Sequence, residues 1–425
     1  MSTNTFAVLQ AVLGVNNVDD PKTAGFQVDP NTGLSQFLTA AQNVDLDKDG
    51  YARRRVGRTK RLDLTSAHSL YAWGDRMFLV DSGTLYEVAP DYGLRALDTG
   101  VGQQPLSYAV VGGQLLYANE TKVGAVDSFW GVQMPSSPLL TPTSGGMLAG
   151  RYLVAVTAVR DGVESGARQP STVQLSAGGG ITLDIAGIDP SADALNIYCT
   201  QPNGRELYWV METTPSSPVM VNLTPPSTDT LTTLGHYPPM PGQQIALYRG
   251  HMLVASGAVL YWSQPLAYHH FRIQTDVQLF PSRITLLAAH DRGFYVGCGT
   301  GTYWVDGSNP DEWQPRLVDS RPPAEGLPLW VDGHKLPTLQ AQGRVSLWAT
   351  ADGFVAGLAD GSVQHLTDGR LAIDAHRHAS LAFREENGLR QVLMSLQEKE
   401  SDTRLGASDR VTCRVIKADQ AIGEP

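Results

Sequence analysis

The stretch AHSLYAWGDRMFLVDSGTLYEVAP, residues 67–90, contains two tight turns within a run of alternating side chains. A Gly-Asp pair and a Ser-Gly pair separate three short segments, which is typical of an antiparallel meander because glycine supplies the positive φ that such turns need. The stretch PLSYAVVGGQLLYANETKVGAVD, residues 105–127, repeats the pattern around Gly112-Gly113. Both stretches predict small antiparallel sheets.

The same pattern returns in three later stretches, residues 245–265, 284–307 and 345–369. Where the repeat is clearest, successive stretches begin about 38 or 39 residues apart, close to the ~40–45 residues of a four-stranded propeller blade. One such sheet cannot bury both of its faces alone, so several would stack radially. We therefore predict an all-β protein with a β-propeller-like domain of short antiparallel blades, although WD and kelch signature residues are absent.

The composition agrees with this fold class. The 425 residues include 43 glycines and 26 prolines, and the many Thr, Val, Tyr and Trp residues favour short strands joined by turns. The formal net charge is −10, so free nucleic acid is not expected to bind the surface as a whole. An acidic surface that lined a channel would instead let DNA pass without adhering.

Cysteine usage and hydropathy indicate the compartment. Cys199, Cys298 and Cys413 lie far apart without a CxxC pair, so neither a disulfide framework nor a zinc site is expected. The N-terminus, MSTNTFAVLQAVLGVNNVDD, lacks a basic segment and an A-x-A cleavage pattern. No stretch approaches the ~18 apolar residues needed to cross a bilayer. We expect a soluble protein synthesised in a reducing cytoplasm.

Residues 147–213 have longer strands, at the turn spacing of a β-sandwich. The strand at 152–156, the acidic loop at 161–165 and the strand at 194–198 before a Pro-Asn-Gly turn resemble a fibronectin type III module. We predict an inserted fibronectin type III-like β-sandwich in a loop of the propeller, because insertions at surface turns cost little stability.

The domain boundaries follow from composition. Segments 134–146 and 213–242 are rich in Pro, Ser and Thr, which is typical of linkers. Near the C-terminus, the segments VLMSL and RVTCRVI are expected to pair as closing strands. We predict three parts: residues 1–134 as the N-terminal segment and first part of the propeller, 135–240 as the inserted sandwich with its linkers, and 241–425 as the second part of the propeller with the closing strands.

The stretch NVDLDKDGYARRRVGRTKRL, residues 43–62, places alternating aspartates before a basic run. Its start matches a calcium loop, but the twelfth position is Val56 instead of a bidentate glutamate, and the basic residues would repel a cation. The alternation around the Asp-Gly pair predicts a β-hairpin. We expect this hairpin to be structural or to form a subunit interface, through Asp45, Asp47, Asp49, Gly50, Arg53, Arg54, Arg55 and Arg58.

The arginine-rich arm of this hairpin has two possible partners. A basic cluster of this density can contact phosphates. It can also contact the acidic surface of a neighbouring subunit, and a chain of net charge −10 offers such a surface. The overall acidity favours the subunit contact.

The sequence lacks the motifs of catalysis and nucleotide binding: G-x-S-x-G, H-E-x-x-H, a Walker loop and a Rossmann fingerprint. The glycine-rich stretch 297–303 has no helix after it to bind phosphate and is predicted to be a turn. Asp306, Asp311 and Glu312 do not identify a glycosidase pair, because a separation in space cannot be read from one sequence.

Histidine pairs and aromatic pairs are interpreted as structural. His269-His270 and the pair His376 and His378 would face opposite sides of a strand or lack two further ligands, so we expect them to be solvated or at an interface. Tyr261-Trp262 and Tyr303-Trp304 are expected to pack in the core and between blades, because each buries a large apolar area. We predict no catalytic residue, metal or cofactor.

The N-terminal region carries a family resemblance. Gly14-Val15-Asn16-Asn17 precedes Asn43-Val44-Asp45-Leu46-Asp47, which is followed by Gly50 and by Arg54-Arg55-Val56-Gly57. This pattern resembles the N-terminal signature of the tail nozzle (tail hub) proteins of short-tailed bacteriophages. It covers residues 14–58, and the blade-like repeats extend the similarity in kind.

The resemblance implies a structural virion protein without enzymatic activity. Such proteins form a six-fold ring at the phage tail, below the portal and adaptor, and the ring extends the channel for DNA ejection. The implied partners are other copies of the chain in a homohexamer, the portal or adaptor protein, tail fibres or tailspikes or a plug, and genomic DNA that passes without sequence-specific binding. An acidic lumen would suit that passage.

Two other function classes remain open. A receptor-binding or fibre-anchoring virion protein would contact a cell-surface glycan through its sandwich and aromatic loops, and a trimer-forming stretch would favour it. A propeller enzyme acting on polysaccharide would need a convergent carboxylate pair. The sequence identifies neither feature.

Overall fold

The computed structural model describes residues 14–19, 37–38, 44–46, 52–54, 59–176, 178–336, 339, 341–367, 369–373, 378–386, 389–397 and 414–417. In this part of the chain the regular structure is β-strand, apart from short 3-10 turns, among them Pro310–Glu312 and Gly333–Lys335. The predicted all-β class is therefore confirmed. The described residues contain no helix of the length and apolarity that a membrane span requires.

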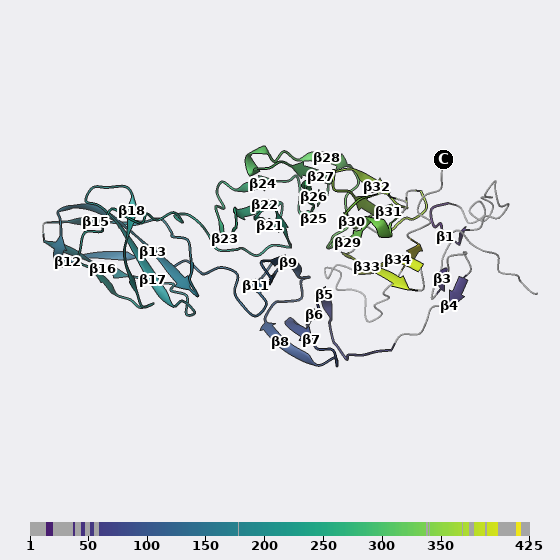
Figure 1. The fold of residues 1–425 in the computed structure, drawn as a ribbon, viewed down its shortest axis with the longest axis horizontal. Helices are drawn as coiled ribbons and strands as arrows, with labels where there is room; N and C mark the ends of the chain where they lie inside the picture. The colour runs from purple at the N-terminus through teal and green to yellow at the C-terminus, as the bar shows by residue number, and fades with distance from the viewer. Residues whose placement is uncertain are drawn as a thin grey trace, which may run out of the picture. The chain divides into compact units, whose positions relative to one another are not determined.

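The chain divides into two compact units, whose strands are labelled in Figure 1. We call the first the insertion-bearing unit, which comprises Ser66–Ala89 and Leu94–Leu279. We call the second the terminal unit, which comprises Met1–Thr65, Pro90–Gly93 and Phe280–Pro425.

Three antiparallel meander sheets belong to the insertion-bearing unit. The first contains β5 (His68–Trp73), β6 (Arg76–Asp81), β7 (Thr84–Val88) and β8 (Leu94–Thr99). The second contains β9 (Ser107–Val111), β10 (Gln114–Ala118) and β11 (Val123–Ala125). The third contains β20 (Gln244–Tyr248), β21 (His251–Ser256), β22 (Val259–Gln264), β23 (Ala267–Phe271) and β24 (Val277–Leu279). The predicted turns are observed, with positive φ at Gly83 and Gly113, where glycine avoids the strain of a side chain.

Neighbouring sheets of this unit share apolar cores. Phe78 and Leu85 of the first sheet pack with Leu115 of the second. Leu116, on the opposite face of β10, packs with Ile245 of the third sheet. Each sheet thereby buries faces that it could not bury alone, as the repeat predicts.

The chain leaves the second sheet for a long insertion and returns beside it. The Ser107 hydroxyl on β9 accepts a hydrogen bond from the Ile245 N–H of β20 at 3.0 Å and donates to the Ile245 carbonyl at 3.4 Å. These residues are 138 positions apart. Strands β9 and β20 are therefore neighbours although the whole insertion separates them in sequence.

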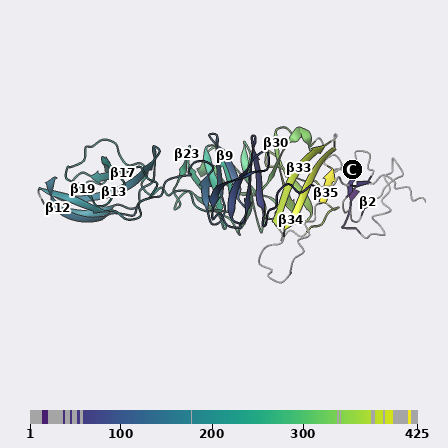
Figure 2. The same cartoon turned by 90° about the horizontal axis from the view of Figure 1, so that it is seen from below.

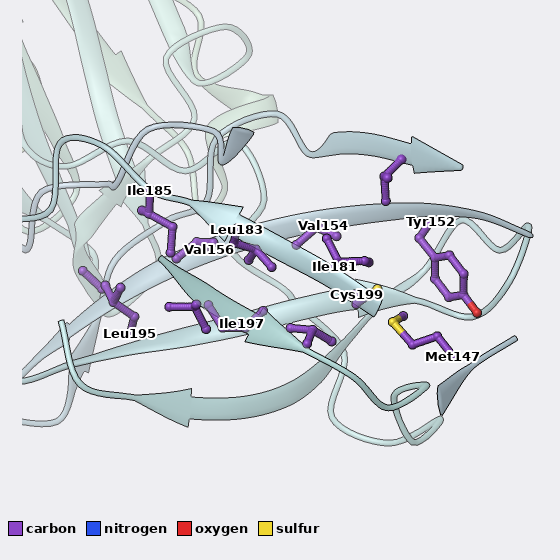
Figure 3. Close-up of a cluster of buried hydrophobic side chains, with 14 of the residues drawn as sticks. Met147, Tyr152, Val154, Val156, Ile181, Leu183, Ile185, Leu195, Ile197 and Cys199 are labelled. Atoms are coloured by element: carbon purple, nitrogen blue, oxygen red, sulfur yellow. The ribbon is translucent and has the colours of Figure 1, made fainter. Parts of the chain in front are cut away.

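The insertion consists of two facing sheets, drawn in teal at the left of Figure 1. One sheet contains β12 (Leu139–Met147), β16 (Gly179–Asp184) and β19 (Val219–Val221). The other contains β13 (Gly150–Arg160), β14 (Val163–Glu164), β15 (Ser171–Leu175), β17 (Ala194–Thr200) and β18 (Leu207–Thr213). Side chains of both sheets, among them Val154, Ile181 and Leu195, meet in one buried core (Figure 3).

The predicted linkers beside the insertion are partly strands. β12 contains residues 139–146 of segment 134–146 and pairs with β16 from Leu139 to Ser144, and β19 lies inside segment 213–242. Pro142 is tolerated because β12 is an edge strand, where a missing N–H need not interrupt a ladder. The linker prediction is wrong for these residues, since their composition is also compatible with edge strands.

The terminal unit contains two further four-stranded meander sheets. The first is formed by β25 (Ile284–Ala289), β26 (Gly293–Cys298), β27 (Gly301–Asp306) and β28 (Arg316–Asp319). The second is formed by β29 (Leu329–Asp332), β30 (Arg344–Thr350), β31 (Gly353–Gly357) and β32 (Val363–His365). Tyr295 and Trp304 of the first pack with Trp348 of the second. The same packing of sheet on sheet thus recurs in this unit.

The predicted closing strands are also paired. β34 (Leu389–Gln397) pairs antiparallel with β35 (Arg414–Lys417), and β33 (His378–Glu386), which was not predicted, pairs with β34. Figure 2 shows β33 and β34 side by side. Near the N-terminus, where no element was predicted, β1 (Gly14–Val15) pairs in parallel with β2 (Phe37–Leu38).

Candidate functional site

The segment that follows β1 is bonded to the loop after β32. The Asn17 N–H donates to the Arg370 carbonyl at 3.1 Å, and the Asn17 side chain exchanges two hydrogen bonds with the backbone of Ala372, at 2.9 and 2.8 Å. The asparagine amide offers the same donor and acceptor as a peptide group. The Asn17 side chain therefore forms the hydrogen bonds of a backbone pair with Ala372, which lies 355 positions later in the sequence.

Asn16 shapes the chain locally. Its side chain is 1% exposed, and its Oδ1 accepts the N–H groups of Val18 and Asp19, both at 3.1 Å. Its Nδ2 donates to the Asp19 carboxylate at 2.8 Å. This Asx-type turn gives the two asparagines of the Gly14–Asn17 segment distinct roles, one local and one long-range.

The basic hairpin is present as a pair of short antiparallel strands, β3 (Val44–Leu46) and β4 (Ala52–Arg54). Asp45 lies opposite Arg53, and Arg54 is exposed. The predicted antiparallel pairing is therefore observed. The turn and the second half of the basic run, with Asp47, Asp49, Gly50, Arg55 and Arg58, lie outside the described residues.

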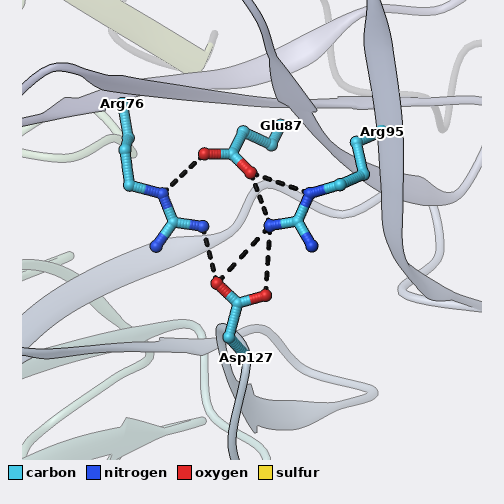
Figure 4. A network of polar contacts seen from close by, with 4 residues as sticks. All are labelled: Arg76, Glu87, Arg95 and Asp127. Carbon is cyan, nitrogen blue, oxygen red and sulfur yellow. Dashed lines mark hydrogen bonds and ion pairs between the residues drawn. The ribbon is translucent and has the colours of Figure 1, made fainter.

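A charge network not predicted from the sequence joins the first sheet to the loop after β11 (Figure 4). Arg76 on β6 donates to Glu87 on β7 at 2.6 Å and to Asp127 at 2.7 Å. Arg95 on β8 donates to the same two carboxylates, at 2.5 and 2.9 Å to Glu87 and 3.1 Å to Asp127. Two arginines and two carboxylates thus alternate in a neutral group.

The network holds all four groups in their charged forms. The hydrogen bond from Arg76 is the largest cause that keeps the pKa of Glu87 and the pKa of Asp127 below their usual values, and Arg95 adds to it. Glu87 in turn is the first cause that raises the pKa of Arg76 and of Arg95. Because opposite charges are paired throughout, the network suits a structural tie better than a binding site for an ion.

One serine–histidine pair also occurs. His290 Nε2 lies 2.8 Å from Ser346 Oγ, and the hydroxyl donates to the Gly357 carbonyl at 3.4 Å. Which atom donates across the 2.8 Å contact depends on the imidazole tautomer, so the distance by itself does not identify a general base. Burial lowers the pKa of His290 to about 4, and Ser346 is fully buried. The pair has the geometry of a polar contact inside the core.

The other residues examined for chemistry are also in structural positions. Cys199 and Cys298 are free and buried, and burial raises the pKa of the Cys199 thiol to about 12. In the glycine-rich stretch 297–303, residues 299–300 form the turn between β26 and β27, and the other residues belong to these two strands. Over the described ranges, no three His, Cys, Asp or Glu side chains are arranged to hold a metal ion. Cys413 lies outside those ranges.

The three carboxylates at the end of β27 and after it lie at the surface. Asp306, Asp311 and Glu312 are all exposed. Asp306 accepts the Trp304 indole N–H at 3.1 Å, and Glu312 accepts the Ser308 N–H at 2.8 Å. Asp306 and Glu312 therefore serve as acceptors for residues close to them in the sequence.

Of the states expected for His269 and His270, the solvated one is wrong for His270, which is 7% exposed. His269 is half-buried, and the two ring centroids lie 4.2 Å apart. A third ring, His236, lies 5.3 Å from His270. No pattern in the sequence singled out His236, because it lies in a segment interpreted as a linker. Of the second histidine pair, only His378 is described.

The aromatic pairs lie as predicted. Trp304 is 1% exposed and belongs to the core shared by two sheets of the terminal unit. Trp262 is also buried. Tyr261 packs against the core of the insertion-bearing unit, and Tyr303 makes an edge contact with Phe280. These rings are used for packing and do not form a stacking platform.

Comparison with known proteins gives limited information. No family model matches the chain, and no curated protein matches it. Solved structures with some likeness include the Neurospora crassa Pan2 WD40 domain (8% identity, 77% of this chain and 85% of that chain, TM-score 0.30). Saccharomyces cerevisiae Sqt1 is 11% identical over 80% of this chain and 92% of that chain, with a TM-score of 0.26. TM-scores of this size do not assign a fold, so the architecture rests on the strands themselves.

Proposed function

We propose that the protein is a structural virion protein that forms the ring-shaped tail nozzle of a short-tailed bacteriophage. The observation that carries the proposal is the state of the N-terminal signature. Its asparagines are bonded into the terminal unit, Asn17 to residues 370 and 372, and its hairpin strands are paired. A signature with such contacts is a structural element, which is the role that the resemblance gives it.

The finer architecture belongs to the same proposal. The meander sheets would close into a propeller, and the insertion would be a fibronectin type III-like sandwich. In support, successive sheets share cores within each unit. The insertion also has its own core of two facing sheets, and Ser107 and Ile245 join the sheets on either side of it.

The ring would consist of six copies around a channel that extends the path for DNA ejection below the portal or adaptor protein. A net charge of −10 favours an acidic lumen, through which genomic DNA passes without adhering. The basic hairpin arm would contact the acidic surface of the neighbouring copy. Outward surfaces would anchor tail fibres, tailspikes or a plug. The chain would work without catalytic residues.

The proposal is tested by electron microscopy of the purified full chain, reconstructed without imposed symmetry. A six-fold ring around a channel is the expected result. A monomer, or a trimer at the tip of a fibre, would contradict the nozzle and favour the alternative, a receptor-binding or fibre-anchoring virion protein that contacts cell-surface glycan.

The role of the hairpin is tested in the same experiment with Arg54→Glu, a charge reversal at an exposed position of β4. We expect this variant to lose rings, because a carboxylate would face the acidic neighbour. Arg205→Glu, at an exposed turn of the insertion, is the matched control and should keep them. Rings that persist in both variants would show that the hairpin does not form the interface.

A further inference from the structure

Two segments connect the insertion to the rest of its unit: the outgoing root, between β11 and β12, and the returning root, between β19 and β20. Both roots form hydrogen bonds to one strand, β23. On the outgoing root, the Trp130 indole N–H donates to the Tyr268 carbonyl at 2.9 Å. On the returning root, Tyr237 and Phe271 exchange backbone hydrogen bonds of 2.7 and 2.9 Å. Strand β23 is therefore where the insertion is attached to the third sheet.

Three imidazole rings gather at this attachment. His269 and His270 belong to β23, and His236 precedes Tyr237 on the returning root. The ring centroids lie 4.2 Å apart for His269 and His270 and 5.3 Å apart for His236 and His270. His270 therefore has two imidazole neighbours, and all three groups become cationic on protonation.

The two roots leave little room for these rings to separate. Gly131 on the outgoing root has a φ of +82°, and a Cβ there would lie 2.6 Å from Pro239 Cδ and 3.3 Å from His269 Cβ. The outgoing root, the returning root and β23 are therefore packed together around the histidines. Repulsion between protonated rings could therefore be reduced only if the roots moved away from β23.

The environment favours neutral imidazoles. The Nδ1 atoms of His236 and His270 are buried without a hydrogen-bond partner. Burial lowers the pKa of His270 to about 3, with His269 and His236 as further causes. Burial also lowers the pKa of His269 and of His236.

Two charged groups act on the cluster from the chain after β23. Arg272 lowers the pKa of His236, whereas Asp276 raises it. Arg272 and Asp276 are themselves paired at 3.0 Å, and Asp276 also accepts hydrogen bonds from Gln264 and Thr275. Asp276 is therefore committed to other donors and is not arranged to neutralise a histidine cation.

We propose that His236, His269 and His270 form a pH-sensitive latch, which holds the returning root of the insertion on β23 while neutral and releases it when protonated. Release would break the paired hydrogen bonds of Tyr237 and Phe271 and free the insertion to reorient about its roots. The latch is a property of the single chain and does not depend on the proposed ring.

The direction with pH follows from linkage. Because the pKa of His270 in the closed form lies below its ordinary value of 6.5, the imidazole takes up a proton more readily in the open form than in the closed form. The latch therefore has its full stability above about pH 6.5 and loses it as pH falls toward 3. For His270 alone, the opening equilibrium should rise about 30-fold between pH 7.5 and pH 5.

The test is hydrogen exchange of the full chain at pH 7.5 and pH 5, corrected for the intrinsic exchange rate at each pH. The amides of Tyr237 and Phe271 should lose protection about 30-fold at pH 5. His270→Phe, whose ring cannot be protonated, should reduce that loss, while His334→Gln at an exposed position should behave as the wild type. Equal protection at both pH values, or an unchanged loss in His270→Phe, would overturn the latch.

A second measurement keeps the test decisive if the variant does not fold. The imidazole C–H resonances of the wild-type protein are followed by NMR from pH 8 to pH 5. We expect the closed form of His270 to stay neutral over this range. Ordinary titration of His270, with no exchange between closed and open forms, would overturn the proposal.

Discussion

Asn119 shows how one buried amide can connect three segments of the insertion-bearing unit. Its Nδ2 donates to the Val101 carbonyl at 2.6 Å, and its Oδ1 accepts the N–H groups of Thr121 and Lys122 at 3.0 and 2.9 Å. Its backbone carbonyl accepts the Gly242 N–H at 2.9 Å. The residue is fully buried, so each of its partners depends on it for hydrogen bonding.

We predict that Asn119→Ala lowers the free energy of unfolding by about 2–4 kcal/mol, because several buried polar groups lose their partner at once. Urea unfolding at constant m-value measures the change. Asn119→Asp is the matched control, since it keeps the acceptor for Thr121 and Lys122 and loses the donor to Val101. A loss below about 0.5 kcal/mol for Asn119→Ala would contradict the assigned role.

At the scale of elements, the charge network of Arg76, Glu87, Arg95 and Asp127 connects three strands of the first sheet to the start of the insertion. Asp127 has a positive φ of 56°, a conformation that aspartate tolerates better than most residues. The loop after β11 thus places its carboxylate against both arginines.

We predict that Glu87→Gln lowers the free energy of unfolding by about 1–2 kcal/mol at pH 7, because Arg76 and Arg95 lose a shared anion. The pKa of Glu87 is lowered in the folded state, so its contribution is present above pH 4.5 and is lost as pH falls below that value. Denaturant unfolding at pH 7, 5 and 4 should therefore show a shallower acid loss in Glu87→Gln than in the wild type.

Glu212→Gln serves as the control for this prediction. Glu212 is an exposed glutamate of β18, and its replacement should change neither the stability at pH 7 nor the pH profile. Parallel pH profiles for the wild type and Glu87→Gln would show that the network adds nothing to folding.

At the scale of the whole molecule, the returning root also completes the insertion. The outer face of the larger sheet carries Ala155, Tyr198 and Leu207, and Leu231 of the returning root packs against them. The Leu231 N–H donates to the Leu207 carbonyl at 2.9 Å. The segment interpreted as a linker is therefore part of the folded insertion.

We predict that a fragment of residues 135–237 folds cooperatively, whereas a fragment of residues 135–224 is less stable by about 2 kcal/mol or more. The shorter fragment exposes Tyr198 and Leu207, and each apolar side chain left in water costs about 1.5–3 kcal/mol. Thermal unfolding followed by circular dichroism compares the two fragments. Equal melting temperatures would show that the returning root adds no stability.

The sequence by itself determined the all-β class, the short strands, their turns, the antiparallel pairing in the basic segment and the closing strands. These features follow from local chemistry, because glycine at turns and alternation of period two act over a few residues. The core positions of the Trp262 and Trp304 rings were predictable for the same reason, since large apolar side chains in strands are buried.

Only the tertiary structure decided which distant groups meet. It placed β12 and β19 in segments with linker composition. Both are edge strands, and an edge strand can form by pairing with a neighbouring backbone even where its own residues have low strand propensity. It brought His236 to His270, and Asp127 to Arg76 and Arg95, across 34, 51 and 32 positions. Such contacts depend on how sheets pack, and no local pattern of residues encodes that packing.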